Sequence, residues 1–333
     1  MDNKTIDSLT LIDFNAITVL TCEEMQAVDL LIVTKLSSKV ELINKIASYL
    51  ISNGGKRLRP LLLILTAKAL GDINQHHLTL ATVVEFLHTA SLLHDDVIDE
   101  ATLRRGQKAA NLVWGNAPTV LAGDFLYANA FQMMTLTENV QVMDLVSKTV
   151  ATLTEGEVLQ LTNCHNPHTS EAQYLEVISC KTAILFKTAA HLAALISNAT
   201  PEQTQSLINY GLFLGIAFQL IDDALDYQSN AQELGKNIGA DLAEGKTTLP
   251  LIYAMQHAEP QDAQIIIDAI KTGSADAFEE VYKVVTNTDA IAYTLNKADE
   301  YVQKAIEMLA CLNDSVYKEA LINLAKFSVQ RSY

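Results

Sequence analysis

Hydrophobic residues recur at every third or fourth position through most of this chain, which is the period of an amphipathic or buried α-helix. Capping residues, glycines and prolines interrupt the pattern and mark where helices begin and end. The uninterrupted segments predict helices over residues 25–36, 40–51, 61–70, 78–99, 117–136, 139–162, 170–197, 203–228 and 248–257. Residues 260–333 keep the helical period with more polar positions. The pattern therefore predicts an all-α fold of long helices.

Local signals also bear on where elements and domains begin. Thr21 and Glu24 have the spacing of a capping box ahead of the first predicted helix. Gly71 is suited to end the predicted helix over residues 61–70. No linker rich in Pro or Ser and no shift in composition divides the chain. We therefore expect one domain. Its assignment to residues 21–333, after an N-terminal extension of residues 1–20, follows from the extent of the motif resemblance described below.

One 14-residue pattern occurs twice. Residues 86–99 read FLHTASLLHDDVID, and residues 213–226 read FLGIAFQLIDDALD. Their apolar positions match at one fixed offset, so each copy predicts a buried helix that ends in D-D-x-x-D. We call Asp95, Asp96 and Asp99 the first Asp motif, and Asp222, Asp223 and Asp226 the second Asp motif.

The two Asp motifs suit a site for magnesium ions. In each motif the first and third carboxylates lie one helical turn apart on the same face. Mg²⁺ takes oxygen ligands, commonly one or two carboxylates together with water and substrate phosphates. A single D-D-x-x-D also occurs at solvated helix ends, but two copies in matched apolar helices favour a shared site for Mg²⁺ and a diphosphate. Six carboxylates around one space require cations between them.

Basic residues that suit a diphosphate flank the first Asp motif along the chain. The turn GGKRLRP carries Lys56 and Arg59, and Arg104 and Arg105 follow the motif by a few residues. Arg binds phosphate oxygens in pairs, and Lys binds them as a point charge. Exposed bases at helix ends are the alternative interpretation of both groups.

Further bases surround the second Asp motif along the chain. The segment 235–250, GKNIGADLAEGKTTLP, spaces Lys236 and Lys246 between glycines, as in a loop that closes over a charged ligand. An ordinary Gly-rich linker is the alternative. Lys181, followed by Thr182, lies in an apolar helix, where the pattern alone favours a lysine that reaches the surface.

Composition agrees with a helical protein and excludes some partners. Among 333 residues only 13 are Gly and 6 are Pro, few for a β-rich fold, and 49% are hydrophobic. The net charge of −16, with no basic stripe, argues against a nucleic-acid partner. Four scattered cysteines predict reduced thiols in the cytoplasm. We expect no secretory signal and no transmembrane segment, because the longest apolar stretch, residues 61–67, is too short to span a bilayer.

Together these motifs resemble those of the trans-isoprenyl diphosphate synthases, and most closely the long-chain bacterial branch that includes the octaprenyl diphosphate synthases. The similarity runs from about residue 21 to the C-terminus and includes GGKRLRP, LLHDDVIDE, RRG, GDFLY, EGEVLQL, KTA, FQLIDDALDY, GKNIGADLAEGKTTLPL and AKFSVQR. It implies a bundle of long antiparallel helices around a deep central cavity, usually as a homodimer. It also implies that both Asp motifs hold Mg²⁺ at the cavity mouth.

The resemblance implies roles for further residues. It implies that Arg104, Lys181, Thr182, Gln219, Lys236 and Lys246 help the Mg²⁺ ions to bind the allylic diphosphate. It implies that Lys56, Arg59, His88 and Arg105 bind isopentenyl diphosphate. The implied reaction extends an allylic diphosphate, with farnesyl diphosphate as the expected primer, to a long all-trans polyprenyl diphosphate. The expected product is octaprenyl diphosphate for quinone side chains, passed to the membrane.

Product length depends on the room beside the first Asp motif. Ala90 and Ser91 lie about one turn before Asp95, on the expected path of the growing chain, and both are small. In short-chain members of the family that this chain resembles, Phe or Tyr there closes the path early. Small residues therefore favour a product longer than farnesyl diphosphate. Close helix packing is the alternative reason for small residues at these positions.

Other functions fit the sequence less well. A shorter-chain synthase, from geranylgeranyl to heptaprenyl, stays open because no residue fixes the final length. A terpene cyclase also ionises a diphosphate but needs neither the basic turn nor a second Asp motif. A non-catalytic partner subunit is expected to lack an Asp motif or the Lys loop. A carboxylate di-iron site needs two E-x-x-H motifs, and only Glu85 with His88 forms one.

Overall fold

The computed structural model describes residues 12–52, 55–71, 73–104, 106–228, 239–273 and 275–330. The helices up to the second Asp motif are α1 (Phe14–Val19), α2 (Cys22–Lys35), α3 (Glu41–Ser52), α4 (Leu58–Leu70), α5 (Gln75–Ile98), α6 (Ala110–Trp114), α7 (Asn116–Thr135), α8 (Val140–Asn163), α9 (Glu171–Ile178), α10 (Ile184–Ile196) and α11 (Pro201–Leu225). The later helices are α13 (Ala240–Ala243), α14 (Leu249–His257), α15 (Pro260–Thr272), α16 (Phe278–Asn287), α17 (Ala290–Met308) and α18 (Val316–Gln330). Short turns are η1 (Ser179–Ala183), η2 (Ala275–Ala277) and η3 (Leu309–Cys311), and β1 (Leu103–Arg104) pairs with β2 (Gln107–Lys108) in one antiparallel hairpin. The predicted all-α fold is confirmed, and each predicted helix corresponds to an observed one.

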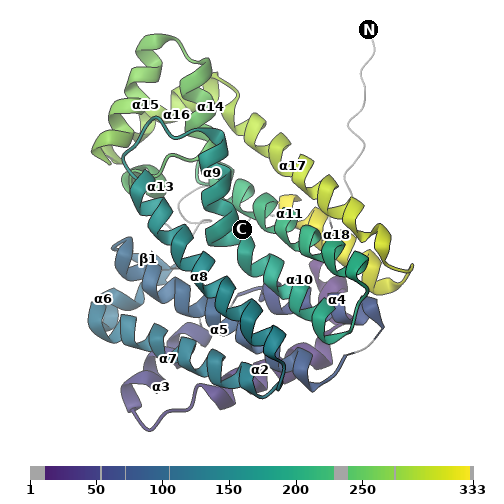
Figure 1. The fold of residues 1–333 in the computed structure, drawn as a ribbon. Coiled ribbons are helices and arrows are strands. Elements are labelled where there is room, and N and C mark those ends of the chain that lie inside the picture. Colours follow the sequence, from purple (N-terminus) through teal and green to yellow (C-terminus); the bar gives the residue numbers. More distant parts are fainter. Residues whose placement is uncertain are drawn as a thin grey trace.

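The bundle is organised around α5 and α11, the helices that carry the Asp motifs. α5 packs along α7, α11 packs along α10 and α17, and α4 contacts both α5 and α10 (Figure 1). The middle of α4 is apolar on every face because it is buried on every face, and residues 61–65 are each 1% exposed or less. The two helices with the Asp motifs therefore belong to one densely packed region.

A smaller hydrophobic cluster forms at one end of the bundle. It contains residues of α14, α15 and α16, such as Ile266 and Val281, and these helices lie at the upper end of the molecule in Figure 1. Tyr227, just after α11, stacks on Phe278 of α16 with ring centroids 5.9 Å apart. This contact ties the smaller cluster to the end of α11 that carries the second Asp motif.

The predicted helix over residues 170–197 contains a π-helical turn, η1, between α9 and α10. Two glycines let neighbouring helices approach this turn closely. A Cβ on Gly156 of α8 would lie 2.8 Å from the backbone of Cys180, and one on Gly215 of α11 would lie 2.5 Å from Cα of Ala183. Such one-turn π insertions often occur at functional sites. Here η1 contains Lys181.

Some local predictions failed at the N-terminal side. Thr21 makes no side-chain capping bond to α2, and its hydroxyl instead donates to a carbonyl of the preceding turn. Oε1 of Glu24 instead forms an ion pair with Nζ of Lys68 on α4 at 2.5 Å, so a tertiary contact replaces the predicted capping box. α1, within the expected extension, packs on α18, where Phe14 and Phe327 stack with centroids 4.6 Å apart.

Two helical stretches, Glu171–Ile196 and Pro201–Leu225, are long and apolar enough to cross a bilayer by length and composition alone. In their most apolar windows 61% and 50% of the residues are buried inside the protein. Core helices of globular proteins pass the same test, and these two supply much of the bundle interior.

Candidate active site

A cavity of about 780 Å³ lies between the C-terminal ends of α5 and α11. Its polar lining comes from both Asp motifs, from the basic turn before α4 and from the segment after α13. Its apolar lining includes Leu92, Val177, Ile178, Leu185 and Phe218. Charged groups and an apolar wall thus share one cavity, as an amphipathic substrate requires.

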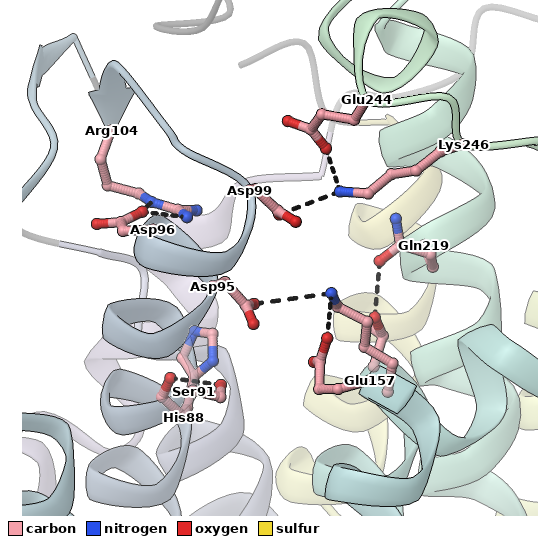
Figure 2. A network of polar contacts seen from close by, with 12 residues as sticks. His88, Ser91, Asp95, Asp96, Asp99, Arg104, Glu157, Gln219, Glu244 and Lys246 are labelled. Atoms are coloured by element: carbon pink, nitrogen blue, oxygen red, sulfur yellow. Dashed lines mark hydrogen bonds and ion pairs between the residues drawn. The ribbon is translucent and has the colours of Figure 1, made fainter. Parts of the chain in front are cut away.

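The first Asp motif divides into two cavity residues and one buried anchor. Asp95 and Asp99 line the cavity, and Asp96 is not part of the lining. Asp96 is 1% exposed, and its Oδ1 accepts hydrogen bonds from Nε and Nη2 of Arg104 at 2.8 and 2.5 Å. In Figure 2, Asp99 points toward Lys246, whereas Asp96 lies against Arg104. Asp96 therefore fixes a cationic side chain that itself lines the cavity.

The second Asp motif also places two carboxylates at the cavity, but they are its first and second residues, so the predicted pairing of its first and third residues is wrong. Asp222 and Asp223 line the cavity, while Asp226 is 5% exposed and is not part of the lining. Oδ1 of Asp223 accepts a hydrogen bond from Nε2 of Gln219 at 2.7 Å, and Oδ2 accepts one from the hydroxyl of Tyr174 at 2.5 Å. Four carboxylates of the six predicted ones therefore face the cavity.

Two lysines cross the cavity toward the first Asp motif. Lys181 places Nζ 2.6 Å from Oε2 of Glu157 and 3.9 Å from Oδ2 of Asp95. Lys246 places Nζ 3.1 Å from Oδ2 of Asp99 (Figure 2). Both lysine side chains are less than one-fifth exposed. The surface interpretation of Lys181, drawn from the helical pattern, is therefore wrong, because the side chain lies inside the cavity.

Burial and mutual repulsion make the carboxylates of this cavity costly to ionise. Burial, assisted by Asp241, raises the pKa of Asp223 to about 8. Burial and the neighbouring Asp95 raise the pKa of Glu157 to about 7, and burial also raises that of Asp95. For Lys246, burial alone would lower the pKa, but the surrounding carboxylates outweigh it and raise the pKa. A cation bound between the motifs would relieve this repulsion.

The donor set fits Mg²⁺ bound together with a diphosphate. The four cavity carboxylates are hard oxygen donors, which Mg²⁺ prefers. Within the described residues no three His, Cys, Asp or Glu side chains form a metal site on their own. Each motif thus supplies an incomplete shell, which water and phosphate oxygens would complete.

The basic turn before α4 is held in an unusual backbone conformation. Arg57 has φ of 44°, in the left-handed region, and its guanidinium pairs with Asp29 at 2.9 Å and lies 3.9 Å from Glu85. These contacts tie the turn to α2 and α5. The residues of this region that line the cavity are Lys56, Arg57, Arg59 and His88. Arg105 and Lys236, which the resemblance places in the site, lie outside the described residues.

The two positions predicted to control product length differ in the structure. Ser91 lines the cavity, and its hydroxyl donates to the carbonyl of His88 at 2.8 Å. Ala90 is fully buried in the main core and is not part of the cavity lining. Thr182 and Gln219 also line the cavity and are joined by a hydrogen bond of 2.8 Å.

Sequence reasoning missed several polar residues of the cavity. Glu157 lies in EGEVLQL, a segment that carried the family resemblance but received no role. Glu244 stands two residues before Lys246 and pairs with it. Tyr174 has no signal in the sequence, because 49 residues separate it from its partner Asp223. Only the fold brings these two side chains together.

Comparison with known proteins gives consistent matches. The family model described as Polyprenyl synthetase matches residues 40–286. The chain is 47% identical over 311 residues to "Octaprenyl diphosphate synthase" of Haemophilus influenzae, covering 93% of this chain and 94% of that protein. It is 42% identical to an all-trans-nonaprenyl-diphosphate synthase of Rhodobacter capsulatus, covering 93% and 95%. The crystal structure of a polyprenyl synthase from Caulobacter crescentus CB15, complexed with calcium and isoprenyl diphosphate, matches with a TM-score of 0.94 at 40% identity, covering 98% of this chain and 100% of that one.

Proposed function

This chain belongs to the polyprenyl synthetase family and is a trans-prenyltransferase, and on that basis we propose that it makes all-trans octaprenyl diphosphate from farnesyl and isopentenyl diphosphates. The main support for the proposal is that both Asp motifs, the basic turn and apolar residues line the same cavity. The length of eight units draws on relatives named octaprenyl diphosphate synthase at 47% and 46% identity.

The allylic diphosphate binds where the two Asp motifs and the lysines converge. Asp95, Asp99 and the second motif would hold Mg²⁺, which would supply Lewis-acid stabilisation to the leaving diphosphate. Lys181 and Lys246 exchange their carboxylate partners for diphosphate oxygens. Because they lie in a largely buried cavity, they stabilise the charge that develops on the departing group more strongly than they would in water.

Isopentenyl diphosphate binds on the opposite side, at the basic turn. Lys56, Arg59 and His88 hold its diphosphate, so its double bond faces the allylic carbon. As the allylic C–O bond breaks, this double bond supplies the electrons of the new C–C bond. Transfer of a proton to the departed diphosphate then restores a double bond and leaves a chain five carbons longer. The apolar wall at Leu185 and Phe218 keeps water from the cationic carbon.

We further propose that the protein works as a homodimer through the faces of α7 and α8. Large apolar side chains are exposed there: Leu121 at 63%, Val140 at 78%, Val158 at 55% and Leu161 at 50%. Several large apolar side chains exposed on two neighbouring helices are typical of a protein interface. Val158→Glu should shift the protein toward monomer in analytical ultracentrifugation. Val316→Glu, at an equally exposed valine on α18, should leave the oligomeric state unchanged.

The proposed setting is the cytoplasm, with the product passing to the membrane for use in quinone side chains. The activity is tested by incubating the purified protein with farnesyl diphosphate, isopentenyl diphosphate and Mg²⁺, then measuring product length by mass spectrometry. Products of eight isoprene units support the proposal. A main product of any other length, shorter or nine units, contradicts the octaprenyl assignment. Absence of elongation in both Mg²⁺ and Mn²⁺ contradicts the proposed activity.

A further inference from the structure

Tyr174 makes a short hydrogen bond to Asp223 of the second Asp motif, and no sequence feature pointed to it. Its hydroxyl donates to Oδ2 of Asp223 at 2.5 Å, and the residue is only 5% exposed. The other oxygen, Oδ1, accepts from Gln219 at 2.7 Å, and Gln219 in turn accepts from the hydroxyl of Thr182 at 2.8 Å. The four side chains form one continuous chain of hydrogen bonds.

This series of hydrogen bonds connects three separate structural elements around one cavity. Tyr174 lies on α9, Thr182 lies in η1, and both Gln219 and Asp223 lie on α11. A carboxylate held at only one oxygen can still rotate about its terminal torsion, whose energy well is broad. Asp223 is held at both oxygens by donors from different directions. Its plane is therefore fixed, with the remaining lone pairs left for a ligand in the cavity.

We propose that Tyr174 is a positioning residue that orients the Asp223 carboxylate for the metal–diphosphate complex and, through Gln219, sets the place of Thr182. This inference rests on the proposed role of the second Asp motif. In this proposal Tyr174 itself makes no contact with the reacting atoms. It acts as the hydrogen-bonding partner behind a metal ligand, and loss of such a partner typically lowers metal affinity by about 10- to 100-fold.

The protein contains a matched control for the loss of a buried tyrosine hydroxyl. Tyr210 lies on α11, is fully buried, and donates to the carbonyl of Leu321 at 2.7 Å. Tyr174→Phe and Tyr210→Phe each delete one hydroxyl and one short hydrogen bond. If the Tyr174 hydroxyl matters only for folding, the two variants should behave alike in metal binding.

The test is isothermal titration of Mg²⁺ into the protein with inorganic diphosphate present. Tyr174→Phe should weaken Mg²⁺ binding by about tenfold or more, and Tyr210→Phe should leave it unchanged while lowering the unfolding temperature. In an Asp223→Asn background, Tyr174→Phe should have little further effect, because the oriented ligand is already lost. Unchanged Mg²⁺ affinity in Tyr174→Phe, or fully additive losses in the double variant, overturns the inference.

The same titration separates this inference from the proposed function. If wild-type protein binds Mg²⁺ with diphosphate, and Asp223→Asn alone weakens that binding, the metal role of the motif stands and only Tyr174 is in question. If Asp223→Asn binds Mg²⁺ like the wild type, the metal role of Asp223 fails, and the assignment of Tyr174 fails with it.

Discussion

Substituting Phe at two adjacent positions of α5 should give two different results. Ser91 lines the cavity, four residues before Asp95 and therefore about 6 Å along the helix axis from the first Asp motif. A Phe there projects into the path of the growing chain. Because the cavity offers room for the ring, the fold should tolerate it, and elongation should stop after the first few isoprene units.

Ala90 presents the opposite case. It is fully buried in the main core, so a Phe ring has no space and must displace its neighbours. Overpacking of this kind costs about 1–3 kcal/mol or more. For a chain of this size each kcal/mol lowers the unfolding temperature by roughly 2–4 °C. Ala90→Phe should therefore lower the unfolding temperature by several degrees, whereas Ser91→Phe should change it little.

Both variants are compared with wild type by mass analysis of products from farnesyl and isopentenyl diphosphates and by thermal unfolding. Shortened products from Ser91→Phe, at nearly normal stability, support the proposed chain path. The reasoning is refuted if Ser91→Phe still makes full-length product at a normal rate, since the growing chain then does not pass Ser91. Shortening by Ala90→Phe with unchanged stability would show that Ala90 faces a tail channel rather than packed core.

Two further predictions concern the Asp motifs. Asp95→Ala and Asp222→Ala should each abolish elongation while circular dichroism shows an intact helical fold; normal turnover in either variant would exclude its carboxylate from metal binding. The pKa of Asp223, raised from 3.8 to about 8, means that the folded, metal-free protein retains a proton that the unfolded chain releases. The stability of the metal-free protein, measured by thermal unfolding, should therefore fall as pH rises from about 4 to about 8. Added Mg²⁺ with diphosphate should offset this loss near pH 8. If the stability of the metal-free protein instead rises through this range, this account of the buried carboxylate is contradicted.

The sequence predicted the helical architecture well because the apolar repeat and the helix ends carry most of the information for this fold. For the first Asp motif it also predicted which two carboxylates share a face. Neighbouring residues on a helix point about 100° apart, so Asp95 and Asp99 face the cavity together while Asp96 turns to Arg104. The same prediction is wrong for the second motif, where the neighbours Asp222 and Asp223 line the cavity and Asp226 does not.

Other parts of the site could not be read from the sequence. The π-helical turn at Ser179–Ala183 depends on close approach by α8 and α11, which Gly156 and Gly215 permit from far away in the chain. Periodicity therefore assigned Lys181 to the surface. The bond between Tyr174 and Asp223 likewise exists only after α9 and α11 pack together. Such contacts are set by tertiary structure, and no local pattern encodes them.

The central claim is that both Asp motifs hold metal ions and one diphosphate at the mouth of an apolar cavity. The most direct measurement is a crystal structure with an unreactive allylic thiodiphosphate, in which Mn²⁺ replaces Mg²⁺ and is located by anomalous scattering. The account predicts Mn²⁺ peaks bound to Asp95 and Asp99 and to Asp222 and Asp223, all contacting the same diphosphate, with the tail running past Ser91. Metal peaks away from either pair, or a diphosphate bound elsewhere, would contradict it.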